Sequence, residues 1–441
     1  AGYKTALVGN ADENENPPSG TTYGRQAAAI AMDRSGQVDH IFMGEGRTRA
    51  GGNSLLLNSM DPGETIGAVN EALNKADLVV VETGDTVRLE KIKNRALDRI
   101  YDSAKKEALV KIDLLVGGII TNVRKYDSLV LIFSTTPSRE AMQESNLLTP
   151  IIYWKDHGEE SFLVSGTTRR QGIVANTDIA PTVLSHFDLP IPVEMTGRPM
   201  YPVAAQNTLA TLIKTNHDLI AVHKARPPLV QGYVFGQIIA VLLTVSVLIF
   251  WRGKIKYFQP LLLALSSIPL AFLLMGFFPG LPFGLFVFGV ILTAGIVTGF
   301  SMLGFRRHHM VPFMMVALFT GAAILLDIIL GAPLMRSSVL GYDPMGGARY
   351  YGLGNEFMGV LIGSLVMGTA ALFQTFESRK LLFGATIGIY GAALFVIAGP
   401  HLGTNAGGAV AAALAFGFTA YQLAPTKVTR TQLAWAGTAV L

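Results

Sequence analysis

Residues 229–251 read LVQGYVFGQIIAVLLTVSVLIFW, a run of 23 residues without a charged side chain. A helix needs about 20 mainly apolar residues to cross the roughly 30 Å of hydrocarbon in a bilayer. The run is too long and too uniformly apolar for the core helix of a soluble domain. It therefore predicts a membrane span, and with it an integral membrane protein.

Further runs of the same kind follow toward the C-terminus. We expect spans at residues 258–276, 281–303, 311–332, 355–374, 381–399 and 403–421, with an eighth that begins near 432. Residues 1–226 are richer in charged side chains, and the pair Pro227 and Pro228 marks the predicted boundary with a transmembrane domain at 227–441. The chain begins at Ala1 without a methionine, so we expect its first domain to be N-terminally incomplete.

Lysine and arginine are unevenly distributed between the loops that join these spans. The loops after the first, third, fifth and seventh spans hold nine of them, namely Arg252, Lys254, Lys256, Arg306, Arg307, Arg379, Lys380, Lys427 and Arg430. The opposite loops carry only Arg336 and Arg349. Short loops rich in these residues stay in the cytoplasm. We therefore expect a multi-pass protein of the cell membrane whose N-terminal domain is extracytoplasmic.

Two loops on the predicted outer side combine glycine with polar side chains. They are residues 331–356, GAPLMRSSVLGYDPMGGARYYGLGNE, and residues 399–408, GPHLGTNAGG. Polar groups near membrane depth are costly unless they pair or line a cavity, which makes them functional candidates. For Arg349, Glu356 and His401, a catalytic role and a structural pairing both remain open. We favour structural pairing for the other polar groups of this region, which are Asp327, Arg336, Asp343, Asn355 and Asn405.

The first domain has an α/β pattern. Short apolar runs rich in β-branched residues predict strands at 4–8, 78–82, 128–133 and 149–154. Helical stretches lie between them, such as residues 65–75 and 89–109. Strands that alternate with helices predict an α/β fold, a mainly parallel sheet with helices on both faces, followed here by an all-α transmembrane bundle. Ligand sites in such sheets form at the carboxyl ends of the strands.

Composition excludes several classes of site. The chain has no cysteine, so disulfides, thiolate metal sites and a cysteine nucleophile are excluded. The net charge is +4, but no basic stripe with interleaved aromatic residues accompanies it, and we expect no nucleic-acid partner. No glycine-rich stretch continues into the GK[ST] of a phosphate-binding loop, which argues against nucleotide binding.

A sequence motif lies near the end of the first domain. Residues 178–182 read DIAPT, an apolar helix follows, and LPIP at 189–192 and MTGR at 195–198 come next. This order resembles the C-terminal signature of the alkaline phosphatase superfamily, which includes sulfatases, phosphopentomutases and lipoteichoic-acid synthase-like enzymes. The resemblance covers residues 1–200 and implies an alkaline phosphatase-like fold for a domain at 1–226.

The metal ligands of that family are not found where the resemblance implies them. Active members have Asp and His after the strand that matches residues 79–82, and Ser-Asp-His-Gly after the strand that matches 129–133. This chain has ETGD at 82–85 and STTP at 134–137. Threonine hydroxyls do not replace carboxylates and imidazoles as ligands of catalytic metals. We interpret DHG at 156–158 as a coincidence, because it follows the next strand. We expect no metal site and no cofactor, without excluding a divalent metal.

A different set of polar side chains remains at the predicted strand ends. Arginines and hydroxyls there suit the recognition of phosphate or carboxylate groups. A salt-bridged replacement for lost metal ligands, which keeps the fold stable, is the alternative. The predicted substrate-binding residues are Glu82, Asp85, Arg88, Thr135, Thr136, Arg139, Arg169 and Asp178, with Thr167, Thr168 and Arg170 in the same cluster.

Three functions fit this sequence. The first is an envelope pseudoenzyme, whose metal-ligand-poor phosphatase-like domain binds an anionic or phosphate-bearing envelope intermediate. The second is an active membrane phosphotransferase or hydrolase of a lipid-linked substrate. The third is a transporter or flippase with its path along the Gly-rich segments. The expected partners are membrane lipid, a lipid-linked or anionic envelope polymer and other envelope proteins. Whether the protein is an enzyme stays open.

Overall fold

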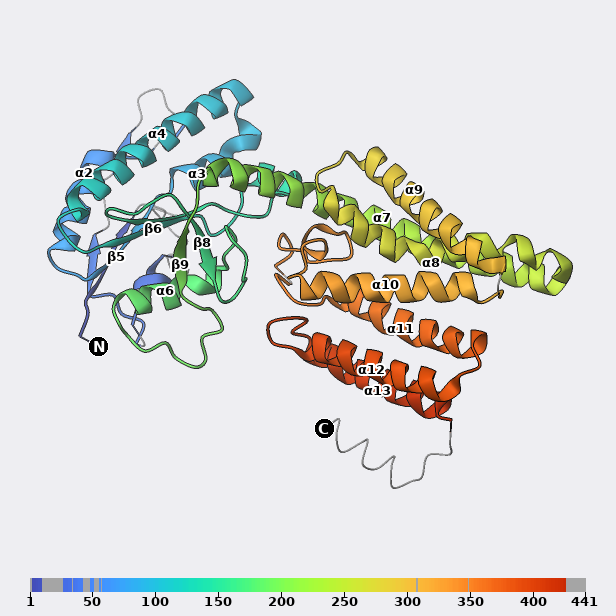
Figure 1. Cartoon of the computed structure of the whole chain (residues 1–441). Coiled ribbons are helices and arrows are strands. Elements are labelled where there is room, and N and C mark those ends of the chain that lie inside the picture. Colours follow the sequence, from blue (N-terminus) through green and yellow to red (C-terminus); the bar gives the residue numbers. More distant parts are fainter. Residues whose placement is uncertain are drawn as a thin grey trace. The chain divides into compact units, whose positions relative to one another are not determined.

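The computed structural model divides the chain into two compact units (Figure 1). It describes residues 2–9, 27–33, 35–42, 48–50, 55–56, 58–306, 308–347 and 349–425. The first unit comprises Ala1–Arg139, Thr149–Glu159 and Leu184–Ile191. The second comprises Glu140–Leu148, Glu160–Val183 and Pro192–Leu441. The second unit thus contains the transmembrane helices together with part of the predicted phosphatase-like domain.

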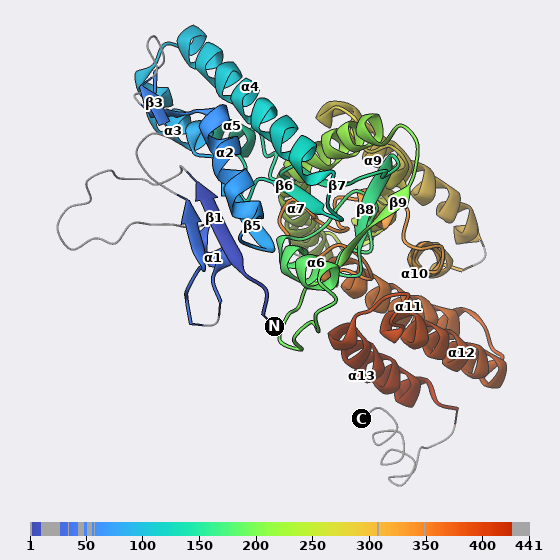
Figure 2. The same ribbon diagram turned by 90° about the vertical axis from the view of Figure 1, so that its left-hand side faces the viewer.

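The first unit is built around a parallel sheet of three described strands. The central strand β1 (Thr5–Gly9) pairs in parallel with β2 (His40–Phe42) on one side and with β5 (Leu78–Glu82) on the other. Helix α2 (Pro62–Leu73) begins after Asp61, whose carboxylate accepts the N–H of Glu64 at 3.1 Å. Its buried face packs on the sheet (Figure 2). The α/β prediction is confirmed for this part of the chain.

The remaining elements of the first unit lie around that sheet. They are α1 (Ala28–Ala31), β3 (Thr48–Ala50), β4 (Asn58–Met60), α3 (Asp85–Ile92), α4 (Asp98–Val123), β6 (Leu129–Phe133) and β7 (Ile151–Lys155). The helix predicted at 89–109 is therefore two helices. Leu89 of α3 and Tyr101 of α4 belong to one buried cluster. On one straight helix they would be about 18 Å apart, so the chain has to turn between them.

The parallel prediction does not extend to the last strands of this unit. Strand β6 pairs with β7 in antiparallel register, from Leu129 opposite Lys155 to Phe133 opposite Ile151. The only described helix between them, α5 (Arg139–Gln143), has five residues. A parallel pair needs a crossover long enough to cover a sheet face, which is usually a longer helix. The strand ends that follow β5 and β6 therefore belong to different sheets.

The second unit begins with a small antiparallel pair and continues into a long helix. Strand β8 (Ser161–Ser165) pairs with β9 (Met200–Ala204), and α6 (Ile179–His186) lies between them in the sequence. Helix α7 (Thr208–Phe250) has 43 residues and passes through Pro227 and Pro228 without a break. Its length corresponds to roughly 65 Å, about twice the thickness of the hydrocarbon core. It extends beyond the ends of α10–α13 (Figure 1).

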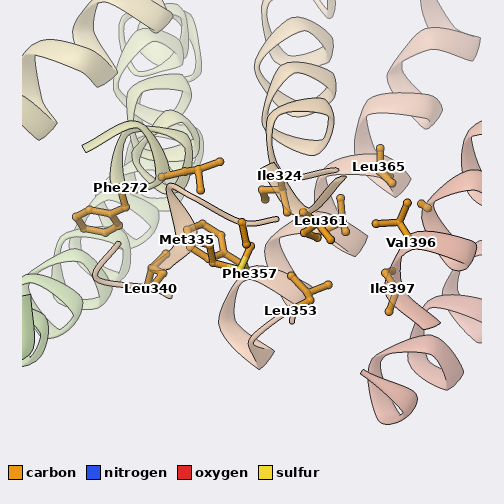
Figure 3. Close-up of a cluster of buried hydrophobic side chains, with 14 of the residues drawn as sticks. Phe272, Ile324, Met335, Leu340, Leu353, Phe357, Leu361, Leu365, Val396 and Ile397 are labelled. Atoms are coloured by element: carbon orange, nitrogen blue, oxygen red, sulfur yellow. The ribbon is translucent and has the colours of Figure 1, made fainter. Parts of the chain in front are cut away.

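Seven described helices are long and apolar enough to cross a membrane. They are α7, α8 (Gln259–Leu274, continued by one 3-10 turn to Phe277), α9 (Phe283–Met302), α10 (Val311–Ile329), α11 (Asn355–Thr375), α12 (Arg379–Ala398) and α13 (Ala406–Leu423). The prediction of a multi-pass membrane protein is confirmed. The predicted eighth span near residue 432 lies outside the described residues. The core of the bundle contains Phe272, Ile324, Phe357 and Leu361 (Figure 3).

Because consecutive spans run in opposite directions, their loops fall on two ends of the bundle. The loops that follow α8, α10 and α12 lie at the same end as the N-terminal half of α7. We call this end the pocket end, for the pocket described below. The loops that follow α7 and α11, which carry Arg252, Lys254, Lys256, Arg379 and Lys380, lie at the opposite end.

Candidate functional site: an arginine pocket at one end of the bundle

The loop between α10 and α11 is held in place by buried polar contacts. The carboxylate of Asp327 accepts the N–H groups of Leu334 and Met335 at 2.8 and 3.0 Å. The hydroxyl of Ser338 donates to the carbonyl of Phe272 at 2.8 Å, and Met335 is fully buried. These bonds fix the turn Met335–Ser337, which carries Arg336. The structural role that the sequence suggests for Asp327 agrees with this geometry.

The segment between β8 and α6 is held by Asp178. This side chain is fully buried, and its carboxylate accepts the N–H of Ala175 at 2.9 Å and that of Arg198 at 3.0 Å. It also accepts the hydroxyl of Thr167. Asp178 therefore ties together three stretches of chain around Arg169 and Arg170. Its lone pairs are used within the protein, which is the geometry of an anchor rather than of a substrate ligand.

Arg169, Arg170 and Arg336 meet at a pocket of about 460 Å³ within the second unit. We call it the arginine pocket. Its other lining residues come from β8, from the turn after it and from α7: Phe162, Gln171, Thr211, Leu212 and Thr215. The volume lies within the range of small-molecule sites, about 300–1,000 Å³. Guanidinium and hydroxyl donors dominate its polar lining.

The charge of Arg170 is poorly compensated. Its Nη1 atom is buried and has no hydrogen-bond partner in the described part of the chain. Burial, and secondly the positive charge of Arg336, lower the pKa of Arg170 to about 10. The group still carries its proton at neutral pH. Two like charges in a partly dehydrated pocket repel each other, and a bound anion would relieve that repulsion.

Tyr342 lies within electrostatic range of three arginines. Burial raises the pKa of this phenol to about 12, and the charges of Arg336, Arg170 and Arg349 oppose the rise. Among described residues, no carboxylate oxygen lies within 4.0 Å of the guanidinium nitrogens of these three arginines. The charge of Asp327 reaches Arg336 only at longer range. The charges of three arginines and of Asp327 therefore act on this buried phenol, and none of the three arginines has a direct ion pair with a described carboxylate.

Nearby carboxylates are occupied by other partners. Both oxygens of Asp343 lie 3.0 Å from Nδ1 of His223 on α7, and Arg226 lies 3.9 Å from the same carboxylate. Arg226 also pairs with Glu356, in the first turn of α11, at 2.7 Å. The acids at the pocket end are thus engaged by His223 and Arg226. Acidic residues are present in this region, but they are not the counter-ions of the pocket.

Arg169 is aimed differently from its neighbour. Its backbone is left-handed, with a φ of 52°. The guanidinium lies 4.2 Å from the ring centroid of Tyr351 and donates to the carbonyl oxygen of Pro400 at 2.7 Å. A cation over an aromatic ring and a charged hydrogen bond both favour this position. Arg169 therefore joins the turn after β8 to both Gly-rich loops of the bundle.

The structure separates the three catalytic candidates. Glu356 forms the ion pair with Arg226, whereas Arg349 lies within electrostatic range of Tyr342. His401 is exposed in the turn between α12 and α13, next to the carbonyl that binds Arg169. Among the described residues, no hydrogen bond or ion pair joins any two of the three. Of this set, Arg349 alone belongs to the charged surroundings of the pocket.

The predicted binding residues of the first unit form a separate network. Asp85, which is buried, accepts Ser59 Oγ at 2.7 Å, the N–H of Met60 at 3.0 Å and the guanidinium of Arg88. Lys111 also donates to the hydroxyl of Ser59, at 2.7 Å. Glu82 is half-buried at the end of β5. This arrangement agrees with the alternative of a salt-bridged network that stabilises the fold.

Thr135, Thr136 and Arg139 lie elsewhere in that unit. The two threonines are exposed and follow β6, in a different sheet from the one that ends at Glu82. Arg139 is exposed at the start of α5. The single cluster predicted at strand ends is thus divided, and Arg169 and Asp178 belong to the second unit.

The two-metal site implied by the resemblance does not fit the described residues. No group of three or more His, Asp or Glu side chains among them is close enough to hold a metal ion. At the end of β5, the carboxylate of Asp85 is already saturated by Ser59, Met60 and Arg88. We therefore derive no chemical step through a metal in this protein.

Two arginines of the pocket have a larger role than the sequence pattern indicates. The pattern places Arg170 in the wider polar cluster without a binding role and favours a structural pairing for Arg336, yet both line the pocket. Thr211, Thr215 and Leu219 are spaced four residues apart on α7 and continue to His223. This spacing puts the four side chains on one face of α7. It is the feature of the sequence that indicates that this face continues beyond the membrane.

Comparison with known proteins gives one distant similarity. The chain is 28% identical over 191 residues to the 2,3-bisphosphoglycerate-independent phosphoglycerate mutase of Psychromonas ingrahamii. The aligned stretch is 39% of this chain and 34% of the mutase. The chain therefore spans about a third of the length of the curated protein it matches. No family model and no solved structure matches.

Proposed function

We propose that this protein is an integral membrane protein of the bacterial cell envelope that binds an anionic or phosphate-bearing envelope intermediate in the arginine pocket. Arg170 carries the proposal, because its buried Nη1 has no hydrogen-bond partner among the described residues and the positive charge of Arg336 acts on it. A planar guanidinium is well suited to bidentate binding of phosphate or carboxylate. The similarity to a mutase of phosphorylated substrates supports a phosphate-bearing ligand.

The first test is phosphate binding by the full chain in nanodiscs. We expect Arg170→Gln to weaken the binding of inorganic phosphate by about 10- to 100-fold, because a charged hydrogen bond contributes roughly 1.5–3 kcal/mol. Titration calorimetry with wild type and variant measures the change. Lys214→Gln removes one positive charge from an exposed position on α7, the helix that contributes to the pocket, and serves as the matched control. Equal phosphate affinity in all three proteins would refute the proposal.

We further propose that the pocket end faces the outside of the cell. The Lys and Arg residues of the opposite loops support this orientation. Because the chain has no cysteine, single cysteines can report on it. A membrane-impermeant maleimide added to intact cells should label Glu194→Cys, which is exposed in the second unit, and should leave Lys254→Cys unlabelled until the cells are opened. The reverse pattern would place the pocket in the cytoplasm.

The similarity to the mutase also favours a second candidate function, the transfer or hydrolysis of a phosphoryl group. A measurement of phosphate release distinguishes turnover from binding alone. Phosphate release from a generic phosphomonoester such as p-nitrophenyl phosphate, abolished by Arg170→Gln but not by Lys214→Gln, would make the protein an enzyme. Binding of phosphate without release would leave it a binding protein for that class of substrate.

A further inference from the structure

The position of the arginine pocket along α7 indicates how far it lies from the membrane. Arg226 pairs with Glu356 in the first turn of α11, so this ion pair marks the level at which that span begins. Thr215, which lines the pocket, precedes Arg226 by 11 residues. This separation corresponds to about 16 Å of helix rise. Head groups add only about 5–8 Å to each side of the hydrocarbon core. On the opposite wall, the turn that carries Arg336 is held against α8, where Ser338 donates to the carbonyl of Phe272, so the pocket extends from the end of the bundle outward along α7.

The charges of the pocket indicate the charge of its ligand. Arg170 and Arg336 are close enough for one to lower the pKa of the other, and neither forms an ion pair with a described carboxylate. A singly charged anion would leave one of the two positive charges uncompensated. A doubly charged anion neutralises both and offers enough oxygens for two guanidinium forks. Thr215 adds a hydroxyl on the α7 side, whereas the hydroxyl of Thr211 donates to the carbonyl of Asn207 at 3.0 Å.

We infer that the arginine pocket binds a dianionic phosphate, either a phosphomonoester or a diphosphate, carried by a soluble molecule or by a lipid head group. The inference rests on the proposed function and makes it more specific, because the two guanidiniums that line the pocket set the charge of the ligand.

The charge of the ligand is tested with diphosphate and acetate as probes. With the full chain in phosphatidylcholine nanodiscs, we expect diphosphate to bind at least about tenfold more tightly than acetate. Arg170→Gln and Arg336→Gln should each reduce this preference, whereas Lys214→Gln should keep it. Equal affinity for the two probes would overturn the dianion inference and leave anion binding intact. No effect of either arginine variant on any anion would overturn the proposed function as well.

The source of the phosphate is tested with one head group in two forms. Glycerol 3-phosphate is the water-soluble counterpart of phosphatidic acid, and both carry a phosphomonoester. We expect glycerol 3-phosphate to displace diphosphate from the pocket, because it carries the same dianionic group. Stronger displacement by phosphatidic acid in the nanodisc than by phosphatidylglycerol at matched surface charge would assign the phosphate to a lipid head group. Displacement by neither phosphomonoester would overturn the dianion inference. A run at raised salt separates surface repulsion from competition, because salt screens the repulsion.

Discussion

Gly341→Ala is expected to abolish the folded arginine pocket and to lower the yield of folded protein sharply. A Cβ at Gly341 would lie 1.8 Å from the carbonyl oxygen of Met335 and 3.0 Å from that of Ser338. Both contacts are with backbone, so no side-chain rotation relieves them. The N–H of Gly341 also donates to Ser338 at 2.9 Å, which closes the turn at this point. The substituted loop would have to open and would displace the buried Met335.

The consequence for function follows from the neighbours of that turn. Arg336 is adjacent to Met335, and Tyr342 is adjacent to Gly341. Thermal melting followed by tryptophan fluorescence, together with phosphate titration, measures both effects. Gly346→Ala is the matched control in the same loop, because its nearest contact would be Asp343 Oδ2 at an ordinary 3.4 Å. If the two variants melt and bind alike, the tight turn is not what positions Arg336.

The membrane half was predictable because hydropathy and charge are local properties of a sequence. Six of the seven described spans were expected near their observed bounds, since the bilayer requires a fixed length of apolar helix, whereas α7 begins at Thr208 and not at residue 229. Two adjacent prolines suggested a break at 227 and 228, yet α7 continues through them. Proline in a helix interior removes one backbone hydrogen bond and clashes with the carbonyl four residues before it, so the unbroken helix needs support from its surroundings. Contacts of Arg226 with Asp343 and Glu356 add support at that point.

The candidate site was only partly predictable, because its residues come from distant parts of the chain. Arg169 and Arg170 are adjacent in sequence, but the left-handed backbone at Arg169 turns one guanidinium toward Tyr351 and leaves the other in the pocket. Arg336 joins them across more than 160 residues. Its place in the polar cluster at the predicted strand ends favoured Asp178 as a binding residue. The structure instead shows a carboxylate whose acceptor sites are taken by its own chain.

Asp178→Ala is the substitution that separates these two interpretations. It removes the acceptor of three donors, the N–H groups of Ala175 and Arg198 and the hydroxyl of Thr167, in a fully buried position. Leaving buried donors without partners costs about 1–3 kcal/mol each, so we expect the free energy of unfolding to fall by roughly 3–5 kcal/mol. Phosphate binding should be lost together with stability, because the same turn holds Arg169 and Arg170. Melting and phosphate titration on one preparation measure both.

Two further variants make this expectation decisive. Asp178→Asn keeps one carbonyl acceptor of the same size, so its melting temperature should lie between those of wild type and Asp178→Ala. Glu194→Ala removes an exposed carboxylate from the same unit and should change neither property. If Asp178→Ala melted like the wild type and still lost phosphate binding, Asp178 would be a direct ligand of the substrate. A joint loss in proportion to the missing acceptors would establish Asp178 as the anchor that holds the two arginines in place.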